Sequence, residues 1–121
     1  MIVLDYRNSR PIYEQIRDRL RQMIVTGALE EDEKLPSVRS LASDLAVNPN
    51  TIQRAYRELE QEGYLYSVTG KGNFVSRSPD ADRMRIEKLK GELLKIIEEL
   101  RNLDVSNREI ADWISAEDEN D

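Results

Sequence analysis

The sequence predicts a mostly α-helical protein that carries one small β-hairpin. Apolar residues recur at helical spacing in several separate stretches. Aromatic and β-branched residues flank the glycine-rich tetrapeptide Thr69–Gly72, a pattern typical of a hairpin. Ser78, Pro79 and Asp80 mark a boundary, beyond which the apolar spacing becomes regular. We therefore expect one domain over residues 1–77, a two-helix segment over 80–116 and an acidic tail over 117–121.

The first helix is predicted from Pro11 to Thr26. Ile12, Ile16 and Leu20 recur on one face, proline suits the first turn, and Gly27 is a helix stop. The stretch from residue 28 to residue 35 contains four consecutive acidic residues. We expect it to be a solvated loop.

Two short helices around a tight turn are predicted next. Ser37 is the expected N-cap of the first one, which ends before Val47. Asn48 is positioned to cap the second, Pro49 to open it and Gly63 to stop it after Glu62. The inward faces are Val38, Leu41, Ala42 and Leu45 in one helix, and Ile52, Ala55, Tyr56 and Leu59 in the other. Followed by a hairpin, this order is the pattern of a winged helix-turn-helix.

The region from about Ala81 to Leu103 is predicted to be a helix that self-associates. Its apolar residues alternate spacings of three and four, as in a coiled coil. The alternative is an extra helix that covers the first domain. Gly91 interrupts the helix preference and marks either close packing or a bend. The predicted dimerisation residues are Ile86, Leu89, Leu93, Ile96, Leu100 and Leu103.

A capping box at Ser106–Glu109 opens a last helix, which carries Ile110, Trp113 and Ile114 on one side. Two helices with one apolar stripe each leave little enclosed space for a ligand. A small-molecule effector is therefore not expected.

The composition argues against an enzyme. The chain has no histidine and no cysteine, so most nucleophile–base pairs and transition-metal sites cannot be built. We expect no catalytic residue, no metal and no cofactor. A small carboxylate enzyme is the remaining alternative of that class. The sequence shows neither a membrane span nor a signal peptide, so we expect a cytoplasmic location.

The net charge of −6 is concentrated in the second segment. Residues 1–78 contain 11 basic and 11 acidic residues, whereas residues 79–121 contain 7 and 13. The first domain is therefore neutral overall, and a local basic face remains compatible with binding to DNA.

The third helix presents polar and basic residues opposite its apolar face. A recognition helix contacts base edges mainly through its N-terminal residues. Asn50 and Gln53 can grip adenine, and Arg54 can reach guanine or a phosphate. Alone, such a face is equally typical of a solvated helix. The candidate DNA-binding residues are Asn50, Thr51, Gln53, Arg54 and Arg57 on this helix, Arg39 on the preceding one, and Gly70 and Lys71 in the hairpin turn.

Several separate motifs together resemble the GntR family of bacterial transcription regulators. They are Pro11–Ile16, Leu35–Ala42, Val47–Glu60, Gly63 and the Gly70–Gly72 wing. The short helical remainder resembles the YtrA-type branch of that family. The resemblance implies a homodimer that binds a palindromic operator, usually as a repressor, with Arg39 and Gly70 at family contact positions. Other branches often carry arginines where this chain has Pro49 and Gln53, so their operator rules do not transfer.

We therefore predict a sequence-specific, DNA-binding transcription regulator. The alternative is a winged helix that serves as a protein–protein adaptor without DNA. An adaptor has no need for Arg39, Arg54, Arg57 and Lys71 on one face, and this separates the two hypotheses.

Overall fold

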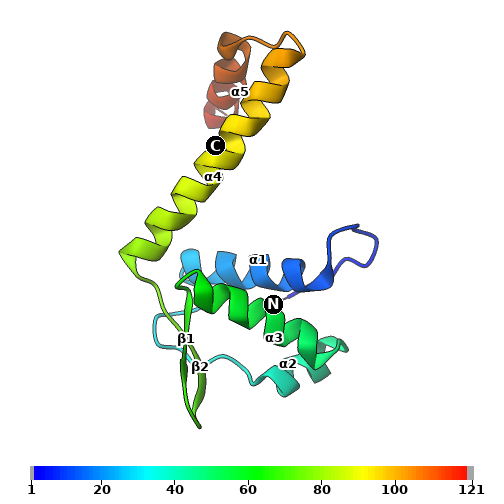
Figure 1. Ribbon diagram of the computed structural model, residues 1–121, viewed down its shortest axis with the longest axis vertical. Coiled ribbons are helices and arrows are strands. Elements are labelled where there is room, and N and C mark those ends of the chain that lie inside the picture. Colours follow the sequence, from blue (N-terminus) through cyan, green and yellow to red (C-terminus); the bar gives the residue numbers. More distant parts are fainter. Residues whose placement is uncertain (1, 120–121) are drawn as a thin grey trace. The chain divides into compact units, whose positions relative to one another are not determined.

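The computed structural model describes residues 2–119 and has, over these residues, five helices and one antiparallel hairpin (Figure 1). The chain divides into two compact units, one ending at Arg83 and the other beginning at Met84. The predicted fold class is confirmed. The elements are α1 (Ile12–Val25), α2 (Val38–Leu45), α3 (Pro49–Gln61), β1 (Leu65–Val68), β2 (Gly72–Val75), α4 (Pro79–Asn102) and α5 (Asn107–Glu119).

Helix α3 lies at the centre of the first unit, where it packs against α1, α2 and β1 (Figure 1). Its residues Ile52, Ala55 and Leu59 are completely buried, as the periodicity predicts. The hydroxyl of Tyr56 donates a 2.8 Å hydrogen bond to the Pro36 carbonyl, which ties α3 to the segment before α2. Because this apolar face is buried, the opposite face of α3 is exposed to solvent.

The helix-turn-helix is built by the expected caps. The Ser37 hydroxyl accepts a 3.1 Å hydrogen bond from the Ser40 N–H, and the Asn48 side chain accepts one of 2.8 Å from the Asn50 N–H. Between the helices Ala46 has a left-handed backbone (φ 56°), and the Val47 N–H reaches the Ala42 carbonyl at 2.9 Å. This turn ends α2 without a glycine.

The turn of the hairpin is one residue shorter than the predicted tetrapeptide Thr69–Gly72. Gly72 pairs with Val68 and belongs to β2, so the turn consists of Thr69, Gly70 and Lys71. The Lys71 N–H closes it on the Val68 carbonyl at 2.9 Å, and Gly70 has φ +77°. A left-handed φ of this kind is the reason for glycine at this position.

The prediction of a solvated loop over residues 28–35 was wrong for its second half. The Asp32 N–H donates to the Val75 carbonyl at 2.8 Å, and the Leu35 N–H donates to the Asn73 carbonyl at 2.9 Å. Lys34 forms a bridge with Phe74. This backbone covers the free edge of β2, whose N–H and C=O groups need partners. The acidic side chains remain exposed. Because four consecutive acidic residues show no apolar alternation, the sequence contains no sign of strand-like pairing here.

Helix α4 begins at Pro79, two residues earlier than expected, because the Ser78 hydroxyl caps the Ala81 N–H at 3.0 Å. Its first turn belongs to the first unit. Ala81 is buried, and the Tyr64 hydroxyl donates to the Asp82 carboxylate at 3.1 Å. Gly63 (φ +88°) lies beneath it, and a Cβ there would approach the Ala81 Cβ to 3.1 Å.

In the second unit, α4 ends at Asn102, one residue before the predicted end. Asp104 is left-handed (φ 66°), and the Val105 N–H returns to the Leu100 carbonyl at 3.0 Å. Ile110 of α5 is buried, and Leu100 is half-buried. α5 extends to Glu119, so residues 117–119 of the expected tail are helical, whereas 120 and 121 lie outside the described residues.

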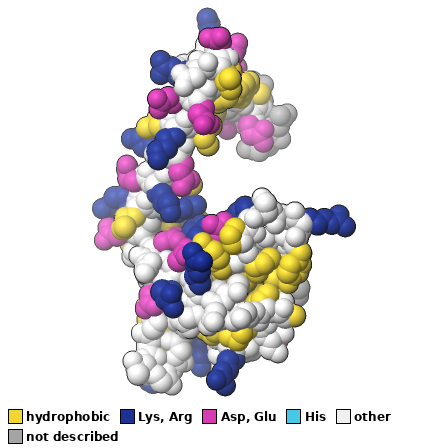
Figure 2. Space-filling view, turned by 45° about the vertical axis from the view of Figure 1, so that its right-hand side comes forward, with side chains coloured by type: hydrophobic (Ala, Val, Ile, Leu, Met, Phe, Trp, Pro, Cys, Tyr) yellow, Lys and Arg dark blue, Asp and Glu magenta, His cyan; other side chains and the backbone are white. Residues whose placement is uncertain are grey.

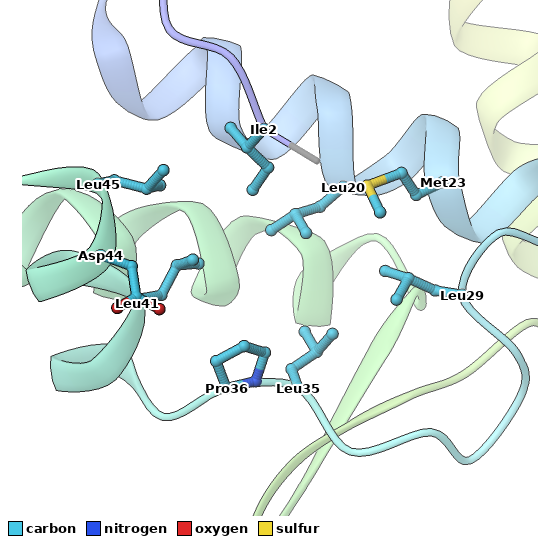
Figure 3. Close-up of a pocket in the computed structure, with 9 residues that line it drawn as sticks. All are labelled: Ile2, Leu20, Met23, Leu29, Leu35, Pro36, Leu41, Asp44 and Leu45. Atoms are coloured by element: carbon cyan, nitrogen blue, oxygen red, sulfur yellow. The ribbon is translucent and has the colours of Figure 1, made fainter.

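Besides a hollow of about 330 Å³ between α1 and the start of α3, two larger hollows lie among the described residues. One of about 460 Å³ lies between α1, α2 and the segment before α2 (Figure 3), and none of the predicted DNA-binding residues lines it. The other, of about 560 Å³, lies against α4 and is lined by Leu94, Ile97, Glu98, Arg101 and Asn102. Three of its five lining residues are charged or polar and all belong to one helix. It is therefore not the walled apolar cavity typical of a ligand site.

Candidate nucleic-acid interface

The exposed face of α3 carries the predicted recognition residues in a row. Asn50, Arg54 and Arg57 follow one another at spacings of four and three, so they lie on one side of the helix, opposite the buried residues. Gln53 is exposed beside them. Thr51 differs from the others in being half-buried. Together with Asn50 and Arg54 it lines a small hollow toward Tyr13 of α1.

The remaining candidates lie on two other elements of the first unit. Arg39 is in the first turn of α2 and is exposed. Gly70 and Lys71 form the wing turn, and both are exposed. The structure thus places the candidates on three elements of the first unit: the two helices of the helix-turn-helix and the hairpin that follows.

The charge of these residues is available to a partner. Within residues 2–119, Arg39, Arg57 and Lys71 form no salt bridge. In contrast, basic and acidic side chains alternate along α4 (Figure 2). Unpaired cations on a helix-turn-helix and its wing are the electrostatic pattern that phosphate binding requires.

A ladder of ion pairs behind α3 was missed in the sequence. Arg17 Nη1 lies 2.7 Å from a Glu58 carboxylate oxygen, and Arg21 holds Glu62 through two bonds of 2.8 and 2.9 Å. The signal was present, since the two arginines of α1 are four residues apart, as are Glu58 of α3 and Glu62 at its C-terminal cap. Such spacing places each pair on one helix face.

These contacts change the proton affinities of the partners. Burial opposes the charge of Arg17, but hydrogen bonds to Glu58 and Asp18 raise its pKa. Burial alone would raise the pKa of Glu58, but its hydrogen bonds with Arg17 and Arg54 lower it. Asp18 behaves similarly, because Arg17 holds its pKa below the usual value against the effect of burial. Arg17, Asp18 and Glu58 are therefore ionised at neutral pH, and the pair of Arg17 with Glu58 helps to fix α3 on α1.

Arg54 is also in contact with α1. Its guanidinium carbon lies 3.7 Å from the centroid of the Tyr13 ring, and its Nε lies 3.3 Å from Glu58 Oε2. Neither Tyr13 nor Glu58 was among the predicted site residues. Tyr13 belongs to the Pro11–Ile16 motif, to which the sequence assigned no contact.

The described residues contain neither a metal-binding cluster nor a membrane-spanning helix. No group of three or more histidine, cysteine or acidic side chains among them is arranged to hold a metal ion. None of the described helices is long and apolar enough to cross a membrane.

The capped helix-turn-helix, the hairpin after it and the unpaired cations together define a winged-helix DNA-binding protein. Residues 12–75 match the family described as "Bacterial regulatory proteins, gntR family". The chain therefore belongs to the GntR family of bacterial transcription regulators, which are DNA-binding proteins rather than enzymes.

Its relatives agree with this assignment. The chain is 34% identical to the HTH-type transcriptional repressor YtrA of Bacillus subtilis over 116 residues. This alignment covers 94% of the chain and 89% of that protein. This confirms the expected resemblance to the YtrA-type branch. A GntR family transcriptional regulator from Listeria monocytogenes has a TM-score of 0.75 and 37% identity, over 93% of this chain and 98% of that one. A structure of the AraR DNA-binding domain in complex with operator ORR3 matches with a TM-score of 0.54 and 32% identity. This match covers 61% of this chain and 89% of the AraR chain.

Proposed function

We propose that this regulator binds a palindromic operator as a homodimer and represses transcription by occluding a promoter. The observation that carries the proposal is an exposed apolar row on α4, a helix that is rich in charged residues. It consists of Ile86, Leu89, Leu93 and Ile96, whose exposed fractions are 62, 44, 51 and 54%. Large apolar side chains repeated at spacings of three and four need a partner surface.

A second copy of the chain is the partner that the row fits. Each fully buried leucine or isoleucine contributes about 1.5–3 kcal/mol, so four on each chain compete with a typical cost of association. The mixed charges beside the row, such as Lys90 and Glu92, permit ion pairs between copies. Of the other predicted dimerisation residues, Leu103 is 74% exposed in the turn after α4, whereas Leu100 is half-buried.

A twofold dimer presents two identical recognition helices, and an operator for it has two inverted half-sites. In each half-site we propose that α3 enters the major groove, with Asn50 and Gln53 toward adenine and Arg54 toward guanine or a phosphate. Arg39, Arg57 and the Gly70–Lys71 turn contact the DNA backbone. The structure of the related AraR DNA-binding domain in complex with an operator supports the proposal that this unit binds operator DNA. A protein that acts on the bacterial chromosome works in the cytoplasm.

The proposal is tested by placing charge in the apolar row. Leu89→Asp with Leu93→Asp puts two carboxylates into the expected interface, where burial without a partner is costly. We expect sedimentation to show monomers. We expect the affinity for operator DNA to collapse in a gel shift with duplexes from upstream of the protein's own gene.

The matched control is Lys88→Asp with Lys95→Asp. These exposed positions lie on the opposite side of α4, and the change in net charge is larger. The control should remain a dimer and fold normally. A stable dimer of the Leu89/Leu93 variant would place the interface elsewhere.

A further inference from the structure

Arg54 is the predicted DNA-binding cation that the protein itself holds in place. Its flat face is covered by the Tyr13 ring at 3.7 Å, and its Nε is within 3.3 Å of Glu58 Oε2. Its side chain is nevertheless 57% exposed. Arg39, Arg57 and Lys71 have no such contacts among the described residues, so the arrangement is particular to Arg54.

The N–H donors of Arg54 that remain without a partner in the described part of the chain all lie at the outer end of its guanidinium. A guanidinium has five N–H groups in a planar fork. Glu58 takes the Nε–H, and the two terminal nitrogens, Nη1 and Nη2, have no partner within residues 2–119. Four N–H donors at the end of the fork therefore remain, and an end-on pair of nitrogens matches two adjacent acceptors such as guanine O6 and N7 or two phosphate oxygens.

We propose that Tyr13 and Glu58 are positioning residues that aim the terminal nitrogens of Arg54 at the operator. This inference rests on the proposed DNA binding by α3. Tyr13 fixes the plane of the guanidinium, and Glu58 fixes its rotation within that plane. The Pro11–Ile16 motif, which lies outside the helix-turn-helix, thereby acts on recognition through α3.

The two positioning residues are themselves anchored. Arg17 Nη1 binds Glu58 at 2.7 Å, and the Arg17 guanidinium carbon lies 5.8 Å from the centroid of the Tyr13 ring. Tyr13 is half-buried on α1. Arg54 is thus oriented before DNA arrives, which reduces the side-chain ordering that binding would otherwise require.

Glu58 also brings a negative charge close to the DNA phosphates. Its removal in Glu58→Gln should tighten binding to any duplex by about fivefold at 0.15 M salt, because one net charge changes the log–log salt slope by about 0.9. Because Arg54 is then held less firmly, discrimination between operator and scrambled DNA should fall if Arg54 binds a base edge. If Tyr13→Leu lowers discrimination but Glu58→Gln leaves it unchanged or improves it, Glu58 is removed from the proposal.

The role of Tyr13 is tested with a double-mutant cycle on operator and scrambled duplexes of equal length. Tyr13→Leu removes the ring and should weaken operator binding about 2- to 10-fold, the range expected for ordering one long side chain on binding. Tyr13→Phe keeps the ring face and should bind almost as the wild type does. In an Arg54→Ala background, Tyr13→Leu should have no further effect. Equal losses in both backgrounds would show that Tyr13 does not act through Arg54.

The operator and scrambled duplexes also distinguish the two acceptors. If Arg54 binds a guanine edge, the Tyr13→Leu loss is confined to the operator. If it binds phosphate, both duplexes lose affinity equally. Either result supports positioning, provided that the loss disappears in the Arg54→Ala background.

A spectroscopic measurement on the free protein separates this proposal from DNA binding itself. The Arg54 Nε–H resonance should carry a ring-current shift that Tyr13→Leu abolishes and Tyr13→Phe retains. Its absence in the wild type would overturn the positioning geometry even if the operator is bound. If the shift is present but the wild type does not distinguish operator from scrambled DNA, the proposed function fails and the positioning role fails with it.

Discussion

At the scale of single residues, the contacts that matter most lie behind the recognition face. Arg17 and Arg21 on α1 pair with Glu58 and Glu62 on α3, and Arg21 is only 6% exposed. A buried guanidinium requires such partners, because leaving it unpaired would be costly. The recognition helix is therefore fixed by charge as well as by its apolar face, and the contribution of charge depends on ionised carboxylates.

The ladder predicts a dependence of stability on pH. The pKa values of Glu58 and Asp18 are lowered from ordinary values of 4.5 and 3.8 in the folded state. Their stabilisation is therefore complete above these ordinary values and is lost as the pH falls through the lowered values. We expect the free energy of unfolding in urea to decrease over this acidic range.

We compare the wild type with Glu58→Gln, in which the free energy of unfolding should decrease less steeply as the pH falls. Glu60→Gln serves as the matched control, since Glu60 is exposed on the same helix and forms no ion pair among the described residues. High salt should reduce the effect, because the Glu58 and Asp18 side chains are 28 and 32% exposed and are partly screened. Identical pH profiles for the wild type and Glu58→Gln would contradict the prediction.

Arg39 provides a second prediction at this scale. It is exposed and unpaired in the first turn of α2, so Arg39→Ala should leave the fold intact. If it contacts phosphate, operator and scrambled DNA should be weakened alike, and the log–log salt slope should become shallower by about 1. A loss confined to the operator would instead place Arg39 on a base. Unchanged affinity for both duplexes would remove it from the interface.

At the scale of elements, α4 has two parts with different partners. Its first turn is anchored in the first unit through buried Ala81 and the Tyr64–Asp82 hydrogen bond. Beyond Met84 its side chains are mainly exposed, and one face is apolar. A single continuous helix thus links the DNA-binding unit to the surface that we propose for dimerisation.

Gly91 gives a prediction for this helix. A Cβ at Gly91 would meet nothing within 4 Å, and the residue lies on the opposite side of α4 from Leu93 and Leu89. Gly91→Ala should therefore stabilise the helix by about 1 kcal/mol, the difference in helix preference. Thermal unfolding should shift upward, and sedimentation should show an unchanged dimer. Loss of the dimer would instead show that the glycine is needed for close packing between copies.

At the scale of the whole molecule, symmetry connects the two units. If α4 and α5 join two copies about a twofold axis, the operator must present its half-sites on matching faces of the DNA. One helical turn of DNA is about 10–10.5 base pairs. The distance between half-sites is therefore a property of the dimer rather than of either winged helix alone.

An operator with five base pairs inserted between its half-sites tests this connection. The insertion turns one half-site to the opposite face of the DNA, so we expect the affinity to fall by about tenfold or more. Substituting the same number of central base pairs without changing the spacing is the control. Equal affinity for the inserted and original operators would show that the two half-sites are bound independently.

The sequence by itself determined the order of the elements and most of the candidate interface. Caps at Ser37 and Asn48 and the period of the buried residues are local signals, and local hydrogen bonding and amphipathicity specify where α2 and α3 begin and which face is exposed. The polar row on α3 followed directly. The tertiary structure alone decided which distant groups meet. Residues 32–35 pair with β2 because a sheet edge needs backbone partners, whatever its side chains are. Tyr13 covers Arg54, and Arg17 binds Glu58, because the packing of α1 on α3 joins residues about forty positions apart, and no local pattern encodes that distance.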